Sequence, residues 1–228
     1  MNSPSASLPN SVALVIGGSE KVIEEYRAAK ALCADLAIVT FVANDMIADF
    51  PDRIDHAVTM HSYKLERSNG WLPARRRTGL ELPRRVWSHP LIRQTRAQQP
   101  QPKRKPDAGV TDQFTDPTGK WNAASGVSSG TLAAKIAKDL GHTRIILCGV
   151  PLEIKAGHFK RRRDWTWAPT PQLHCKKNAE ELRPYVRSMS GWTMQLFGFP
   201  DRAWLRPPVA LPLAPIPTAL QDINVQSV

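Results

Sequence analysis

Residues 126–152 read GVSSGTLAAKIAKDLGHTRIILCGVPL and contain the clearest helix-to-strand pattern in the chain. Ser128 or Ser129 can cap a helix whose end is marked by Gly141. Leucine, alanine and isoleucine recur along one face of that helix, as packing against a core requires. The next residues, 144–148, form a short apolar run that is typical of a strand covered on both faces. This stretch therefore predicts a helix followed by a buried strand of a parallel sheet.

The N-terminal half repeats this alternation. Residues 12–18, VALVIGG, form a β-rich apolar run that ends in two glycines, and helical spacing follows to about Cys33. The other predicted elements are strands at 35–42, 54–60 and 84–88, a late strand and turn at 186–192, and helices at 71–77 and 178–186. Strands that alternate with helices pair in parallel. The sequence therefore predicts an α/β fold, a Rossmann-like and mostly parallel sheet flanked by helices.

This alternation predicts a single domain over residues 12–205. Residues 94–118 interrupt it with a segment rich in Gln, Pro and Lys that has few apolar side chains. We expect this segment to be a disordered insertion, because it cannot bury enough apolar surface to fold. Residues 206–228 form a Pro-rich tail without periodicity, which we expect to be extended or disordered.

Composition narrows the class of protein. The 228-residue chain has a net charge of +11, and its positive charge gathers at 84–105 and 155–163, which favours anionic ligands. Three cysteines without a C-x-x-C pair argue against a disulfide scaffold or a structural metal site, and fit a reducing compartment. No apolar run reaches the roughly 18 residues of a membrane span. Because the N-terminal segment also lacks the basic start of a signal peptide, we expect a cytoplasmic protein.

Open parallel sheets bind ligands beyond the carboxyl ends of their strands, which gathers one set of candidate residues. The glycine–serine turn at 17–19 either holds a phosphate against a helix N-terminus or is simply a tight turn. The SSG sequence at 128–130 either lets a ligand approach its glycine or only caps a helix. The full candidate set for ligand binding is Gly17, Gly18, Ser19, Asn44, Asp45, His61, Ser128, Ser129, Gly130, Gly149, Val150 and Pro151.

Histidines and cations follow the strand at 144–148. His158 and His174 are candidate general bases, although a loop histidine can equally be a solvated side chain. His61 directly follows another strand and can be a base, a ligand donor or a structural histidine. A basic run with two tryptophans close behind can contact phosphates and stack a base, or can be a solvated loop. That run comprises Lys160, Arg161, Arg162 and Arg163, followed by Trp165 and Trp167.

Four aspartates lie close together in the sequence. They are Asp45, Asp49, Asp52 and Asp55. Their spacing does not match a calcium-binding loop, which needs a glycine at its sixth position and a glutamate at its twelfth. We therefore expect solvated surface carboxylates and no metal site.

Two motifs together resemble a small superfamily of Rossmann-like enzymes. The turn VIGGS at 15–19 and the segment at 128–150, SSG followed by LGHTRIILCGV, are similar to bacterial family 42 sialyltransferases and archaeal 6-hydroxymethylpterin pyrophosphokinase-type proteins. The segments HSYKL, WLPARRR and VRSMSGW also resemble short phage and prophage proteins. The first turn is shorter than the family's, and Pro151 stands where the family has an aspartate. In the sialyltransferases a histidine beyond this strand is the general base, which His174 matches in local context and His158 in position.

The resemblance implies a nucleotide-sugar-dependent glycosyltransferase, sialyltransferase-like and of phage or prophage origin. A nucleotide sugar would be the donor substrate, Asn44 would contact the donor, and no cofactor is needed. One alternative is a Mg²⁺-dependent nucleotide phosphotransferase with Asp45 near the phosphates. Another is a non-enzymatic phage accessory protein, in the bacterial host cytoplasm, that binds nucleotide or nucleic acid weakly through its basic loops. The oligomeric state stays open.

Overall fold

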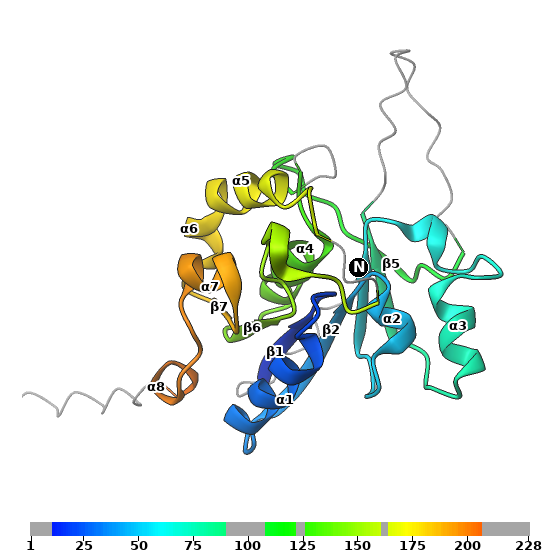
Figure 1. The fold of residues 1–228 in the computed structure, drawn as a ribbon, viewed down its shortest axis with the longest axis horizontal. Helices are drawn as coiled ribbons and strands as arrows, with labels where there is room; N and C mark the ends of the chain where they lie inside the picture. The colour runs from blue at the N-terminus through cyan, green and yellow to red at the C-terminus, as the bar shows by residue number, and fades with distance from the viewer. Residues whose placement is uncertain (1–10, 90–107, 122–125, 161–163, 207–228) are drawn as a thin grey trace, which may run out of the picture.

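The computed structural model describes residues 11–89, 108–121, 126–160 and 164–206 (Figure 1). Its strands form one sheet in which every neighbouring pair is parallel. The strands are β1 (Ser11–Ile16), β2 (Ala37–Ala43), β3 (His56–Thr59), β4 (Arg85–Ser88), β5 (Asp112–Gln113), β6 (Ile145–Cys148) and β7 (Val186–Ser188). The predicted α/β, Rossmann-like class is confirmed.

The order of the strands is β5-β4-β3-β2-β1-β6-β7. From β1 the chain moves outward through β2, β3, β4 and β5, and then returns to the other side of β1 to add β6 and β7. The direction of winding therefore reverses between β1 and β6, which are direct neighbours. Loops that leave the two strands at such a reversal diverge to opposite faces and open a crevice at their carboxyl ends.

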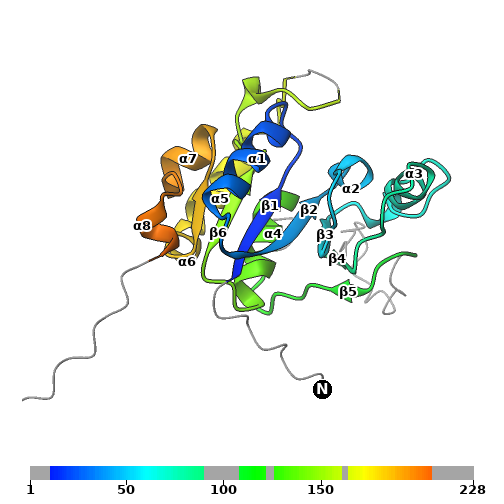
Figure 2. The same cartoon turned by 90° about the horizontal axis from the view of Figure 1, so that it is seen from below.

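Helices cover both faces of the sheet, as Figure 2 shows on either side of β1. Alternate residues of β1 divide between the faces: Ala13 and Val15 join one core cluster, and Leu14 and Ile16 join the other. The first cluster is covered by α4 (Ser129–Asp139), α5 (Pro169–Lys177), α6 (Ala179–Leu182) and α7 (Gly191–Phe197). The second is covered by α1 (Val22–Leu32), α2 (Met46–Asp49), α3 (Trp71–Arg77) and α8 (Arg202–Leu205). Two short 3₁₀ turns are η1 (Ser62–Lys64) and η3 (Ile154–Ala156).

The start of α4 follows the sequence prediction. Ser128 is the N-cap: its hydroxyl accepts the Thr131 N–H at 3.1 Å, and the Thr131 hydroxyl accepts the Ser128 N–H at 3.2 Å. Gly141, just after the helix, has a φ of 93°, the left-handed backbone that glycine adopts without strain. The helix and the buried strand β6 at 145–148 are therefore confirmed.

Two predicted segments differ in the structure. The prediction of a disordered insertion at 94–118 is wrong for residues 108–118. These residues include β5, and they place the Phe114 side chain in the core at 6% exposure. The remaining residues of that segment, 94–107, and those of the tail, 207–228, lie outside the described residues. The helix predicted at 178–186 ends at Leu182, since Val186 already pairs with β6.

The sequence did not predict α5 and α7. α5 has prolines within its first three residues, and prolines in a sequence usually indicate a loop, although proline is tolerated in a first helical turn.

Among the described helices, none combines the length and apolar character needed to cross a bilayer.

Candidate functional site

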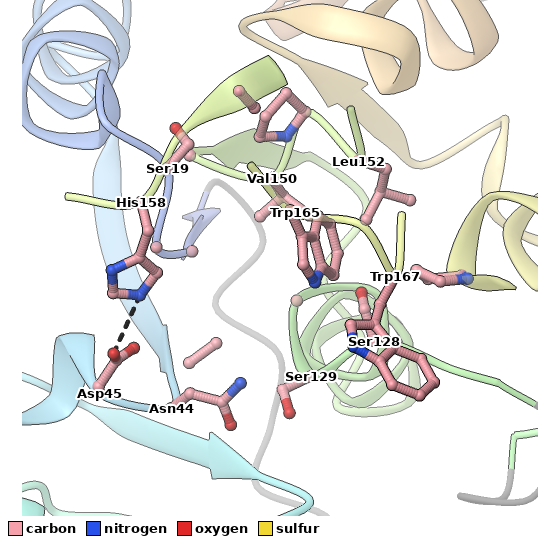
Figure 3. A pocket seen from close by; sticks show the side chains of 18 of the residues that line it. Ser19, Asn44, Asp45, Ser128, Ser129, Val150, Leu152, His158, Trp165 and Trp167 are labelled. Carbon is pink, nitrogen blue, oxygen red and sulfur yellow. Dashed lines mark ion pairs between the residues drawn. The ribbon is translucent and has the colours of Figure 1, made fainter. Parts of the chain in front are cut away.

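A cavity of about 660 Å³ opens at the carboxyl ends of β1, β2, β3 and β6 (Figure 3). Its size is that of pockets that hold small molecules. The turn after β1, the N-terminus of α4 and the loop after β6 complete its walls. The cavity is lined by every residue of the candidate ligand-binding set and by one of the two predicted bases: Gly17, Gly18, Ser19, Asn44, Asp45, His61, Ser128, Ser129, Gly130, Gly149, Val150, Pro151 and His158.

His174, one of the two predicted bases, lies elsewhere. Its side chain belongs to α5 and is only 3% exposed. The ring packs edge-on against Trp121 at 5.1 Å between centroids, and its Nε2 lies 2.7 Å from the backbone oxygen of Lys120. His174 does not line the cavity. The structure therefore corrects this assignment, because α5 turns the imidazole into the core.

A carboxylate and an imidazole meet inside the cavity. Nε2 of His158 lies 3.0 Å from Oδ2 of Asp45, and Figure 3 shows the pair on the wall below Ser19. Gly18 lies beside both side chains, since a Cβ added there would be 3.3 Å from His158 Nε2 and 3.7 Å from Asp45 Oδ1. The Phe159 N–H donates to the Gly18 carbonyl at 3.1 Å, which holds the loop against the first turn. The pair thus joins the ends of β2 and β6 across β1.

Both ring nitrogens of His158 have partners. Nδ1 accepts the Lys160 N–H at 3.2 Å, so a neutral ring carries its proton on Nε2 and donates it to Asp45. Protonation of Nδ1 therefore requires the Lys160 contact to open. The Asp45 carboxylate would then face an imidazolium and stabilise its charge.

Asn44 presents its amide nitrogen to the cavity (Figure 3). Its backbone φ is 53°, a left-handed conformation that asparagine tolerates better than most residues. The buried Thr59 hydroxyl donates to Asn44 Oδ1 at 3.0 Å and accepts the His61 N–H at 2.8 Å. Because Oδ1 is occupied, the free part of this side chain is its NH₂ group. The cavity therefore holds a fixed hydrogen-bond donor at Asn44.

His61 lies at the rim of the cavity, edge-on to Tyr63 at 6.0 Å between ring centroids. Within the described residues its ring makes no hydrogen bond. Desolvation and the nearby charge of Lys64 lower the pKa of His61, while Asp45 acts in the opposite direction. The imidazole is therefore neutral at pH 7 and has a lone pair available to a ligand.

The two glycine–serine turns differ in the hydrogen bonds they can offer. In the first turn, the Gly17 N–H donates to Cys148 O at 2.7 Å and the Ser19 N–H donates to Gly149 O at 3.2 Å. The buried carboxylate of Glu25 accepts the Gly149 N–H at 2.7 Å nearby. These contacts occupy the N–H groups of Gly17 and Ser19 and add a negative charge beside the turn. The geometry supports the tight-turn interpretation for residues 17–19.

The N-terminus of α4 retains free donors. Within the described residues the N–H groups of Ser129 and Gly130 have no acceptor, and the first turn of α4 carries no acidic side chain. Gly130, however, is small for a packing reason. A Cβ there would lie 2.8 Å from the side chain of Val150, which also packs against Gly17. Contact with Val150 is therefore one reason why residue 130 is a glycine.

The loop after β6 lies on the ligand side, as expected. Its Lys160 side chain, however, forms an ion pair with a carboxylate outside the cavity. Lys160 Nζ lies 2.5 Å from Asp49 Oδ2, and Lys160 does not line the cavity. Arg161, Arg162 and Arg163 lie outside the described residues. The expected phosphate contact is therefore not made by Lys160 in this arrangement.

The four clustered aspartates are bound to neighbours rather than simply solvated. Asp45 and Asp49 pair with the loop, and Asp52 accepts from Tyr26 at 2.5 Å and from Lys30 at 2.9 Å. Asp55 is buried at 7% exposure and accepts the Thr40 N–H at 3.0 Å. The expectation of solvated carboxylates is wrong for Asp55, since its role is to join β2 to β3.

The cavity is also lined by Leu152, Asp164 and Thr170, which the sequence did not single out, and by the two tryptophans of the basic run. Leu152 has a φ of 52°, and it and Asn44, the described non-glycine residues with positive φ, both line the cavity. Such strained residues cluster at ligand sites. Trp165 and Trp167 also form part of the wall, and Trp167 is 74% exposed (Figure 3). Asp164 joins the cavity from the loop after β6, and Thr170 joins it from the first turn of α5.

Within the described ranges, no three His, Cys, Asp or Glu side chains are close enough to hold a metal ion.

Comparison with protein-family models, with curated proteins and with solved structures finds no match to this chain.

Proposed function

We propose that the protein is a nucleotide-sugar-dependent glycosyltransferase whose donor occupies the cavity between β1 and β6. The observation that carries the proposal is the Asp45–His158 pair at 3.0 Å inside this cavity. An imidazole oriented by a carboxylate is suited to take a proton from a hydroxyl. The same cavity offers an amide donor at Asn44 and free N–H groups at the start of α4.

The phosphate of the donor would bind at the N-terminus of α4. Helix α4 has eleven residues, and its aligned peptide dipoles favour an anion at Ser129 and Gly130. The first turn is less suited, because Glu25 already places a carboxylate there. A phosphate at α4 leaves the sugar directed toward Asn44 and Asp45 across the cavity, while Trp165 and Trp167 provide aromatic surface for a base.

Transfer would proceed by attack of an acceptor hydroxyl on the anomeric carbon. The new bond joins the acceptor oxygen to that carbon, and the bond to the leaving phosphate oxygen breaks with its electron pair. His158, or alternatively His61, accepts the hydroxyl proton, and Asp45 stabilises the resulting imidazolium. Such proton transfer contributes roughly 10²–10⁴-fold to the rate. A nucleotide-sugar donor also fits a cytoplasmic reaction.

The test begins with binding and ends with turnover. A ligand present at about 100 times its Kd should stabilise the protein by about 2.7 kcal/mol, so a thermal-shift screen of nucleotides and nucleotide sugars identifies the donor. Release of nucleotide is then measured with and without acceptors. H158Q and H61Q distinguish the two bases: the variant of the true base loses most of the rate, and D45N slows the reaction in either case.

D139N is the matched control, because Asp139 pairs with Lys135 on the outer surface of α4. It removes a carboxylate without touching the cavity, so its rate should equal that of the wild type. A nucleotide that stabilises the protein but is consumed only with Mg²⁺ would instead favour the phosphotransferase, with Asp45 as a metal ligand. Absence of stabilisation by any nucleotide or nucleotide sugar would reject both enzymatic proposals.

A further inference from the structure

A second candidate surface adjoins the cavity at His61. It consists of Tyr63 and Lys64 in η1, Arg67 in the following loop and Arg77 at the end of α3, all of them exposed. We call these four residues the η1–α3 surface. In Figure 1 this part of the chain lies on the side of α2 and α3, away from α5–α8.

The loop between η1 and α3, which carries this surface, has a closely packed backbone. Gly70 closes it: the Gly70 N–H donates to Arg67 O at 2.6 Å, and a Cβ on Gly70 would lie 2.4–2.7 Å from the carbonyl oxygens of Leu65, Lys64 and Arg67. Leu65 is fully buried and anchors the loop, and its carbonyl accepts the Leu72 N–H at 3.1 Å. With carbonyls turned inward and Leu65 buried, the side chains of Lys64 and Arg67 are left at the surface.

The cations of this surface are not neutralised by acids. Within the described residues, Lys64, Arg67 and Arg77 form no ion pair with a carboxylate, whereas neighbouring Arg76 pairs with Glu66 at 2.8 Å. Arg77 donates to the Ser68 carbonyl at 3.2 Å, which brings the end of α3 beside Arg67. Positive charge is therefore concentrated and available to an anion.

An aromatic ring is interleaved with these charges. Tyr63 is 42% exposed, with the Arg67 guanidinium carbon 4.9 Å and Lys64 Nζ 5.8 Å from its ring centre. Lys64 Nζ also lies 5.9 Å from the ring centre of Trp71. Cation–π contacts of this kind hold long side chains in place at the surface. The result is a fixed array of cations around an exposed ring.

From this arrangement we infer that the η1–α3 surface binds single-stranded nucleic acid, with phosphates on Lys64, Arg67 and Arg77 and a base or sugar against Tyr63. Cations that follow a backbone and an aromatic side chain that contacts rings are the elements with which proteins hold single strands without sequence preference. The inference does not depend on the proposed glycosyltransferase activity. The strand would pass the rim of the cavity, since Tyr63 contacts His61.

The test measures binding of a fluorescein-labelled oligothymidylate of about 12 nucleotides to the full chain by fluorescence anisotropy over a series of salt concentrations. Each phosphate contact contributes about 0.7 to the slope of log K against log salt for a single strand. The double variant K64S/R67S should therefore bind more weakly and lose about 1.4 from the slope. Y63S should weaken binding by about fivefold or more at constant slope, and Y63F should restore it.

The matched control is K176S/K177S. It removes the same charge from exposed positions at the end of α5, on the other face of the sheet. Its binding should stay close to that of the wild type. Equal losses in both double variants would show attraction to net charge alone and would overturn the inference. Binding to a sulfated glycan such as heparin, with none to the oligonucleotide, would overturn it as well by assigning the surface to a glycan.

Discussion

Arg75 carries a buried charge that is held by backbone carbonyls. Its side chain is 1% exposed, and its guanidinium donates to the carbonyl oxygens of Ile47, Phe50, Asp52 and Glu81. In this way α3 is fixed to α2 and to the loop before β3. Replacing Arg75 would leave several buried carbonyls without a donor, which costs more than the loss of one exposed hydrogen bond.

We therefore expect R75M to lower the free energy of unfolding by about 3 kcal/mol or more. Urea denaturation measures this difference. R77M, a change of the same kind at an exposed position of the same helix, should stay within about 0.5 kcal/mol of the wild type. Similar losses in the two variants would contradict the role given to the Arg75 carbonyl contacts.

Gly130 offers a second test at the scale of one residue. Alanine usually stabilises a helix relative to glycine, by about 1 kcal/mol. At Gly130 the new Cβ would lie 2.8 Å from Val150, so we expect G130A to destabilise the protein by roughly 1–3 kcal/mol. V150A removes the clashing methyl groups, and a double-mutant cycle with G130A should show favourable coupling. Additive effects of the two substitutions would mean that this contact does not limit residue 130.

At the scale of elements, β7 and the start of α7 support the turn after β6. The buried hydroxyl of Thr193 donates to the Val150 carbonyl at 2.8 Å and lies 2.8 Å from the hydroxyl of Ser188. Gly191, with a φ of 68°, packs its backbone against Pro151. Ser188, Gly191 and Thr193 therefore pack against the turn at Val150 and Pro151, which lines the cavity, and hold it in place.

We expect T193V to destabilise the protein by about 1–2 kcal/mol, because it leaves the Val150 carbonyl and the Ser188 hydroxyl without this partner. T193S keeps the hydroxyl and should lose less. Thermal or urea denaturation compares the two variants. A larger loss in T193S than in T193V would show that the methyl group of Thr193, and not its hydroxyl, holds the turn.

The junction of β2, β3 and β4 makes stability depend on pH. His56 stacks on Phe41 at 4.4 Å between ring centroids, and its Nδ1 accepts the Trp87 indole N–H at 2.9 Å. Burial lowers the pKa of His56 from 6.5 to about 4. As the pH falls from 6.5 toward 4, the unfolded chain therefore takes up a proton that folded His56 does not.

Stability from His56 is thus complete above pH 6.5, declines as the pH falls to about 4, and is constant below that value. The total loss is at most about 3 kcal/mol. H56Q keeps a hydrogen-bond acceptor for Trp87 but does not titrate. Urea midpoints measured from pH 7 to pH 4 should fall less steeply for H56Q than for the wild type, and parallel curves would exclude His56 as a cause.

At the scale of the whole molecule, the cysteines report on global unfolding. Cys33, Cys148 and Cys175 are all free and fully buried. Burial raises the pKa of Cys175 to about 12 and that of Cys148 well above its usual value. The native protein should therefore react slowly with a thiol reagent such as Ellman's reagent, and all three thiols should react rapidly in urea. Rapid reaction of one thiol in the native protein would reveal local opening around that cysteine.

Local patterns were sufficient to predict most of the sheet. β1, β2, β3 and β6 match the apolar runs identified in the sequence to within two residues at each end, since a strand covered on both faces must be apolar along its length. β4 was predicted from its β-favouring Val86 and Trp87. β5 was missed because two residues give no periodic signal. The direct pairing of β1 with β6 places their carboxyl ends side by side. Because parallel strands end at the same edge of the sheet, the predicted residues that follow β1, β2, β3 and β6 share one cavity.

The sequence by itself determined the α/β class and the edge of the sheet at which polar residues gather, because strand and helix periodicities are local properties of the chain. The tertiary structure decided which groups remain available there. It turned His174 into the core, paired His158 with Asp45, and used the N–H groups of Gly17 and Ser19 within the turn. These outcomes depend on contacts between segments far apart in sequence. Strand order and helix packing bring those segments together, and no local pattern of residues specifies them.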